Sequence, residues 1–174
     1  MTEKTKELHV RKPNRLRNYD YSQNGAYFVT ICVKGRHELL GTIDVGDGVL
    51  DVPCIQLSEY GNITKKHIDA IGCHYGHVAI QESIIMPNHI HMIISINREN
   101  GTSRTPSPAQ NRATAILPSL ISTLKRFVHS ECGSSLFQRS YHDHIIRNDD
   151  EYMRIAEYIK NNPATWQEDC FCHK

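Results

Sequence analysis

Two apolar segments follow each other in the sequence with only Pro87 and Asn88 between them. The first is HVAIQESIIM (77 to 86) and the second is HIHMIISI (89 to 96). Both segments are rich in β-branched residues, which is typical of strands. Two residues are too few for any connection except a turn or a bulge, so we expect the two strands to pair antiparallel. The rest of the chain has to supply further strands and the helices that cover them.

The remaining segments predict an α+β fold. AYFVTICVK (26 to 34) alternates as a strand does, and HELLGTID and GVLDV flank a Gly46-Asp47-Gly48 turn as a hairpin would. A helix is expected from its cap at Ser58 to Gly72, and a short strand over 141–147 and a helix over 149–162 are expected near the end. The segment 116–131 predicts an amphipathic helix. Its apolar face carries Leu120, Leu124, Phe127 and Val128. This order resembles the ferredoxin-like split βαβ plan, an antiparallel sheet flanked by helices, with an added C-terminal helix.

Composition is that of a globular protein, and residues 1–174 are expected to form one domain. Hydrophobic residues make up 39% and charged residues 22% of the chain. No apolar run reaches the roughly eighteen residues of a membrane span, and the start of the chain lacks the apolar middle of a secretion signal. Six cysteines without a framework spacing fit a reducing compartment. The expected location is therefore the cytoplasm, with no membrane partner.

The charge distribution is uneven, although the formal net charge is only +1. Residues 1–17 carry six basic against two acidic side chains, a local net charge of +4. Such a basic arm suits a phosphate backbone, and a solvated tail is the alternative interpretation. Residues 97–114 are rich in Pro and Ser and predict a long polar loop. The low net charge argues against a protein that coats DNA without specificity.

His89 and His91 stand at alternate positions of one expected strand and therefore share one face of the sheet. Their separation along the strand, roughly 6 to 7 Å, lets two imidazoles converge on a metal at about 2.1 Å from each nitrogen. The alternative is a pair of hydrogen-bonded histidines on a partly wet sheet face. A second pair, His142 and His144, has the same spacing, so spacing alone does not decide between the pairs.

Tyr158 and Asn162 are four residues apart on the last expected helix, so they lie on one helical face, with Arg154 one turn earlier. A packed tyrosine, a terminating Asn before Pro163 and a surface Arg would explain the same pattern. As a nucleophile, a tyrosine with a pKa near 10 needs roughly 4 kcal/mol of help at neutral pH. A divalent cation on the target phosphate supplies help of that kind by making the phosphorus more electrophilic.

Three sequence segments together resemble the HUH single-strand transposases, and in particular the REP-associated tyrosine transposases. They are RLRNYDYSQNGAYFVTICVKGR near the start, MPNHIH before the apolar strand, and HDHIIRNDDEYMRIAEYIKNNP near the end. The resemblance runs from about Arg15 to Trp166 and selects His89 and His91 over the second histidine pair.

The resemblance implies a DNA strand transferase. His89 and His91 would hold Mg²⁺ or Mn²⁺, with Asn162 as a third ligand where related insertion-sequence transposases usually have glutamine. Tyr158 would attack single-stranded DNA beside a palindromic hairpin and form a 5′-phosphotyrosine. Six basic residues are expected to contact phosphates: Arg11, Lys12, Arg15, Arg17, Lys125 and Arg126. Relatives act as dimers or as monomers, so a homodimer is one of the two expected states.

Two other functions remain open from the sequence. One is a domesticated protein that binds hairpin DNA and no longer cleaves it. The other is a metal phosphoesterase or RNA-binding domain on the same plan, in which Tyr158 is merely packed. The intact trio of His89, His91 and Tyr158 favours the transposase, because a binding protein has no need of all three.

Overall fold

The computed structural model describes residues 19–44, 53–98 and 115–168. At its centre is an antiparallel sheet with the strand order β4-β5-β1-β6. The strands are β1 (Gly25–Cys32), β4 (Val78–Ile85), β5 (His89–Ile96) and β6 (His142–Ile146). Because β1 and β4 both run antiparallel to β5, they are parallel to each other with β5 between them. This is the predicted ferredoxin-like, split βαβ arrangement.

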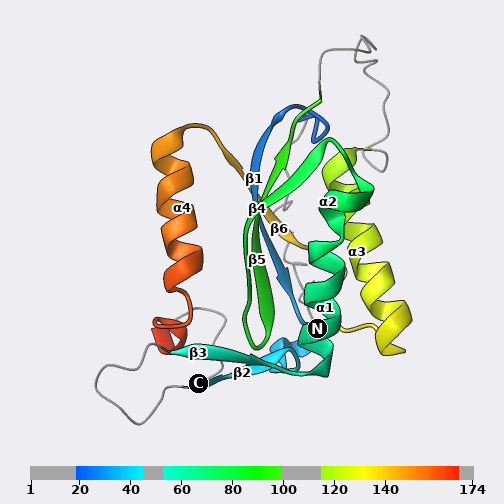
Figure 1. Ribbon diagram of the computed structural model, residues 1–174, viewed down its shortest axis with the longest axis vertical. Coiled ribbons are helices and arrows are strands. Elements are labelled where there is room, and N and C mark those ends of the chain that lie inside the picture. The colour runs from blue at the N-terminus through cyan, green and yellow to red at the C-terminus, as the bar shows by residue number, and fades with distance from the viewer. Residues whose placement is uncertain (1–18, 45–52, 99–114, 169–174) are drawn as a thin grey trace, which may run out of the picture.

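The helices form two layers, one on each side of the sheet (Figure 1). One layer contains α1 (Glu59–Asp69), α2 (Ile71–His74) and α3 (Ile116–Cys132), and the other contains α4 (Asp149–Asn161). The smaller elements are the paired strands β2 (Gly41–Asp44) and β3 (Cys54–Leu57) and the 3₁₀ turns η1 (Lys34–Arg36) and η2 (Trp166–Glu168). Among the described helices, none has the length and apolarity that crossing a membrane requires.

The alternation of side chains along β5 assigns its residues to the two layers. Ile90, Met92 and Ile94 belong to the main core beneath α1 and α3. Ile93 belongs to a second, smaller core with Ala156 and Ile159 of α4. His89 and His91 are four and two residues before Ile93 on the same strand, so their side chains share its face and point to the α4 side. The sheet therefore presents its histidines to the layer that carries Tyr158.

The main core fills the space between the sheet and α3. The buried residues of α3 are Ile116, Leu117, Leu120, Ile121, Leu124 and Val128. Phe127, expected on the same apolar face, is instead 45% exposed. Its ring stacks on His67 of α1, with the ring centroids 5.7 Å apart. The prediction was wrong for Phe127 because that position lies at the margin of the stripe, where α1 rather than the sheet is the neighbour.

Two other expectations about elements need correction. The strand that pairs with Gly41–Asp44 is Cys54–Leu57, whereas the predicted strand GVLDV and its Gly46-Asp47-Gly48 turn lie outside the described residues. The helix that Ser58 caps ends at Asp69, and a separate short helix follows it. Two further segments lie outside the described residues: the arm over 1–17 and most of the loop over 97–114. The arm contains four of the basic residues expected to contact DNA, which are Arg11, Lys12, Arg15 and Arg17.

Candidate active site

His89 and His91 are the first and third residues of β5, and their rings lie against each other. Their Nε2 atoms are 2.9 Å apart, and the side chains are buried, at 0% and 1% exposure. The strand places them there because side chains two residues apart share one face. Pairing with β1 sets Cys32 opposite His89 and Thr30 opposite His91.

Tyr158 approaches the same point from α4. Its hydroxyl oxygen is 3.3 Å from Nε2 of His91, and its ring packs edge-on against Phe28 of β1. The side chain nevertheless remains 42% exposed. The phenol therefore contacts one imidazole of the pair and stays partly open to solvent.

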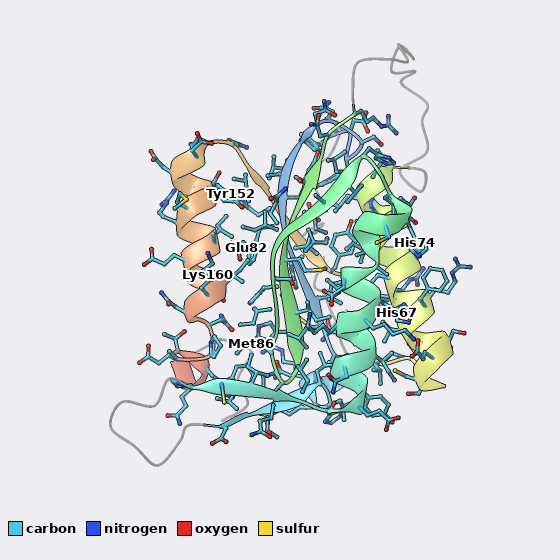
Figure 2. The ribbon with its side chains drawn as sticks, viewed as in Figure 1. His67, His74, Glu82, Met86, Tyr152 and Lys160 are labelled. Carbon is cyan, nitrogen blue, oxygen red and sulfur yellow. The ribbon has the colours of Figure 1, made fainter. Side chains whose placement is uncertain are left out.

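The position of α4 is set by an N-terminal cap, by acidic residues in its first turn and by contacts with the sheet. Asn148 accepts a hydrogen bond from the backbone N–H of Glu151 at 2.8 Å, and three acidic residues occupy the first turn. Ala156 and Ile159 pack on the sheet. Near the other end, Lys160 reaches Glu82 of β4 at 3.0 Å, and the two side chains point toward each other between helix and sheet (Figure 2). These contacts hold Tyr158 above β5.

The chain that follows Tyr158 closes the site. Asn162 is the C-cap of α4, one helical turn after the tyrosine, and its side chain is fully buried. Trp166 in η2 stacks on the His89 ring, with centroids 5.9 Å apart and planes inclined by 27°. The sequence alone did not single out Trp166, although it is the only tryptophan in the chain.

Two further residues that the sequence did not single out support the histidines from behind. Nδ1 of His91 is 2.9 Å from the hydroxyl of Thr30. Nδ1 of His89 is 2.9 Å from the side-chain oxygen of Asn88. The only sequence signal for Asn88 is its place directly before the first histidine. Thr30 carries none, because its role depends on the pairing register of β1 with β5.

The imidazole pair fits a divalent cation. Two nitrogens that each lie about 2.1 Å from one ion at a right angle are about 3.0 Å from each other, close to the 2.9 Å between the two Nε2 atoms. Within the described ranges, no three His, Cys, Asp or Glu side chains gather as a metal site. A cation on this pair would therefore need ligands of another type, and the amide oxygen of Asn162 is of a suitable chemical class.

The second histidine pair occupies the edge strand β6. The register sets His142 opposite Thr30 and His144 opposite Phe28, so both face the α4 side. Nε2 of His144 is 2.8 Å from the carboxylate of Glu151 in the first turn of α4. The backbone N–H of Arg147, and then His144, hold the pKa of the Glu151 carboxyl below its usual range. His144 thus contacts the start of α4 rather than a second imidazole.

Lys125 and Arg126 lie on α3, in the layer opposite Tyr158. The ammonium group of Lys125 donates to the backbone carbonyls of Gln138 and Ser140 at 2.8 and 2.9 Å. The guanidinium of Arg126 lies 5.1 Å from the centre of the Phe127 ring. The structure does not bring these two residues together with the histidines, and their contact with DNA stays a prediction.

Comparison with known proteins identifies the family. The family model for transposases of the IS200-like type matches residues 22–162, and the chain belongs to this family. An uncharacterized protein of Haemophilus influenzae is 36% identical over 175 residues, which cover 93% of each chain. Among solved structures, a REP-associated tyrosine transposase bound to a REP hairpin is similar, with a TM-score of 0.58 and 19% identity over 87% of this chain and 73% of that chain. At that identity the likeness supports the fold.

Proposed function

We propose that this protein is a metal-dependent endonuclease and strand transferase for single-stranded DNA that acts beside palindromic hairpins in the cytoplasm. The observation that carries the proposal is the approach of the Tyr158 hydroxyl to Nε2 of His91 at 3.3 Å, with Nε2 of His89 a further 2.9 Å away. Membership of the IS200-like transposases supports DNA cleavage in general, and the similar structure with its REP hairpin supports the hairpin as the kind of DNA.

Tyr158 is the proposed nucleophile. Its phenol oxygen attacks the scissile phosphorus, and the bond from phosphorus to the 3′-oxygen of the preceding nucleotide breaks. The phenol proton ends on that 3′-oxygen, so the products are a 5′-phosphotyrosine and a free 3′-hydroxyl. Because one phosphoester replaces another, the bond energy is conserved and strand transfer needs no nucleotide cofactor.

His89 and His91 are the proposed ligands of Mg²⁺ or Mn²⁺, with Asn162 as the third protein ligand. The bound cation would polarise the phosphate and offset the charge that develops in the transition state. Two imidazole nitrogens suit Mn²⁺ better than Mg²⁺, which prefers oxygen ligands and retains its water molecules. The residues of this chain hold the phenol and the imidazoles at one point, which reduces the entropy cost of bringing nucleophile and phosphate together.

A covalent-adduct assay tests the nucleophile. The full chain is incubated with Mn²⁺ and a labelled pool of hairpin oligonucleotides with randomised single-stranded flanks, and the products are separated under denaturing conditions. We expect a labelled protein band that Tyr158→Phe abolishes. Tyr152→Phe is the matched control, because Tyr152 lies on the same helix and packs in the smaller core; it should keep the band.

The other outcomes are distinct. An adduct that persists in Tyr158→Phe and disappears in Tyr152→Phe would move the nucleophile along α4. If the wild type retains hairpins on a native gel but gives no adduct with any of them, the domesticated binding protein is the better description.

A further inference from the structure

The side chain of Asn88 is held in one orientation. Its amino group donates to the backbone carbonyl of Arg36 at 3.1 Å, and the side chain is 1% exposed. Arg36 has φ 59°, the left-handed region that is uncommon for residues other than glycine. The backbone of Asn88 is anchored as well, because its carbonyl accepts from the N–H of Val33 at 2.8 Å. The amide therefore keeps its nitrogen toward Arg36.

This orientation decides which nitrogen of His89 carries the hydrogen. With the amino group directed at Arg36, the amide oxygen of Asn88 faces Nδ1 of His89 at 2.9 Å. An amide oxygen only accepts hydrogen bonds, so Nδ1 has to be the donor. In the neutral ring, Nε2 then carries the lone pair, and this is the atom that faces His91.

His91 is supported differently. Its Nδ1 faces the hydroxyl of Thr30, which can donate or accept. Since Nε2 of His89 is an acceptor, the 2.9 Å contact between the two Nε2 atoms takes its hydrogen from His91. The two imidazoles are therefore not equivalent: Asn88 fixes the tautomer of His89, whereas the tautomer of His91 follows from its contact with His89, because the Thr30 hydroxyl is compatible with either.

We propose that Asn88 is a positioning residue that keeps the His89 proton on Nδ1 and the Nε2 lone pair directed into the site. Removing a group that hydrogen-bonds the far nitrogen of a metal-binding histidine typically changes metal affinity about 10- to 100-fold. This consequence for metal binding rests on the proposed function, while the tautomer itself does not. Stacking of Trp166 on the same ring adds to its orientation.

Two measurements on the full chain test the inference. The first is a long-range ¹H–¹⁵N spectrum of metal-free protein labelled at histidine, with the His89 signals identified by their loss in His89→Gln. We expect the wild type to show Nδ1 protonated, and Asn88→Ala to lose that preference. The second is calorimetric titration with Mn²⁺, for which Asn88→Ala should raise Kd about 10- to 100-fold.

Two further variants serve as comparisons. Asn88→Asp keeps an acceptor for Nδ1 and should restore the wild-type tautomer. Asn24→Ala is the matched control, because Asn24 also binds loop backbone with its amide, donating to and accepting from Arg98 at 3.2 and 2.8 Å. It lies at the other end of β1, beyond Gly25, so it should leave both measurements unchanged.

The possible results separate the two proposals. A wild-type spectrum with the His89 proton on Nε2 overturns the inference without any variant. The inference is also overturned if Asn88→Ala folds and matches the wild type in both measurements, and the proposed function then still stands. If the tautomer depends on Asn88 but the wild type binds no Mn²⁺, the inference holds and the metal-dependent function fails.

Discussion

At the scale of single residues, the site places buried polar groups inside an otherwise apolar strand. His89 and His91 are at most 1% exposed, between isoleucines and a methionine. Buried polar side chains are costly unless they are hydrogen-bonded. Each ring nitrogen of the pair has a polar neighbour within 2.9 Å. The histidines are therefore held by a network, and a change in one partner should reach the others.

The hydroxyl of Thr30 gives the first prediction at this scale. Thr30→Val keeps the shape of the side chain but removes the group that faces Nδ1 of His91. We expect the rate of adduct formation with a cleaved hairpin to fall about 10- to 100-fold, the usual effect of losing a group that hydrogen-bonds the far nitrogen of a metal-binding histidine. Thr30→Ser keeps the hydroxyl and should retain most of the activity. Equal rates for Val and wild type would show that the hydroxyl has no part in the site.

Part of the site could be predicted from the sequence. His89, His91 and Tyr158 were found because spacing and the family resemblance converge on them, and the structure brings them together. Their supports Asn88, Thr30 and Trp166 were not found, since hydrogen bonds across strands depend on register and on loops that close in space. The roles of Tyr158, Asn162 and the metal stay predictions until the assays are done.

At the scale of elements, the turn before His89 is held by the segment that leads into α1. Leu40 donates its N–H to the carbonyl of Pro87 at 2.9 Å, and its own carbonyl accepts from the N–H of Ser58 at 2.9 Å. Ser58 caps α1, and Gly61 in the first turn lies directly against the Leu40 carbonyl. The start of α1 and the start of β5 are thus linked through one residue.

Gly61→Ala should therefore destabilise the fold. A Cβ at Gly61 would meet the backbone oxygen of Leu40, which cannot move without disturbing the Pro87 turn. We expect a loss of about 1 to 3 kcal/mol in the free energy of unfolding, the usual cost of overpacking. Gly72→Ala is the control, because nothing lies within 4 Å of a Cβ there, and it should be neutral or stabilising. Urea unfolding of both variants measures the difference.

The order of the elements could be predicted because the spacing of apolar residues clearly distinguishes strands from helices. Strands over 78–85 and 89–96 and helices over 116–132 and 149–161 lie where the patterns placed them. The partner of Gly41–Asp44 was missed because Cys54–Leu57 is short and has no strong alternation. Phe127 was misplaced because a helical stripe does not show which neighbour covers its margin.

At the scale of the whole molecule, one chain supplies both the imidazoles and the phenol. The contact between Tyr158 and His91 lies within a single copy of the protein. Whether two copies associate is a separate question, and a homodimer stays a prediction. The basic residues expected to contact DNA are spread out, with Lys125 and Arg126 on the layer opposite α4. Charge in the sequence therefore does not by itself locate the DNA path.

Mixing inactive variants tests whether each copy completes its own site. His91→Ala and Tyr158→Phe are each expected to form no adduct. Because both residues of the site come from one chain, a mixture of the two variants should remain inactive after joint unfolding and refolding. Recovery of activity, up to the roughly one quarter of wild-type sites that random pairing of the two variants can complete, would show instead that α4 serves the partner copy. Sedimentation of the mixture shows whether dimers are present.

Because Trp166 stacks on His89, its fluorescence should report the arrival of an ion at the imidazole pair. The sequence contains one indole, and it lies against a proposed metal ligand. When the indole is excited at wavelengths that the tyrosines do not absorb, the fluorescence thus comes from a single position without any label. A paramagnetic ion arriving at the imidazoles would quench that emission, so occupancy could be followed in stopped-flow mixing before any DNA is cut.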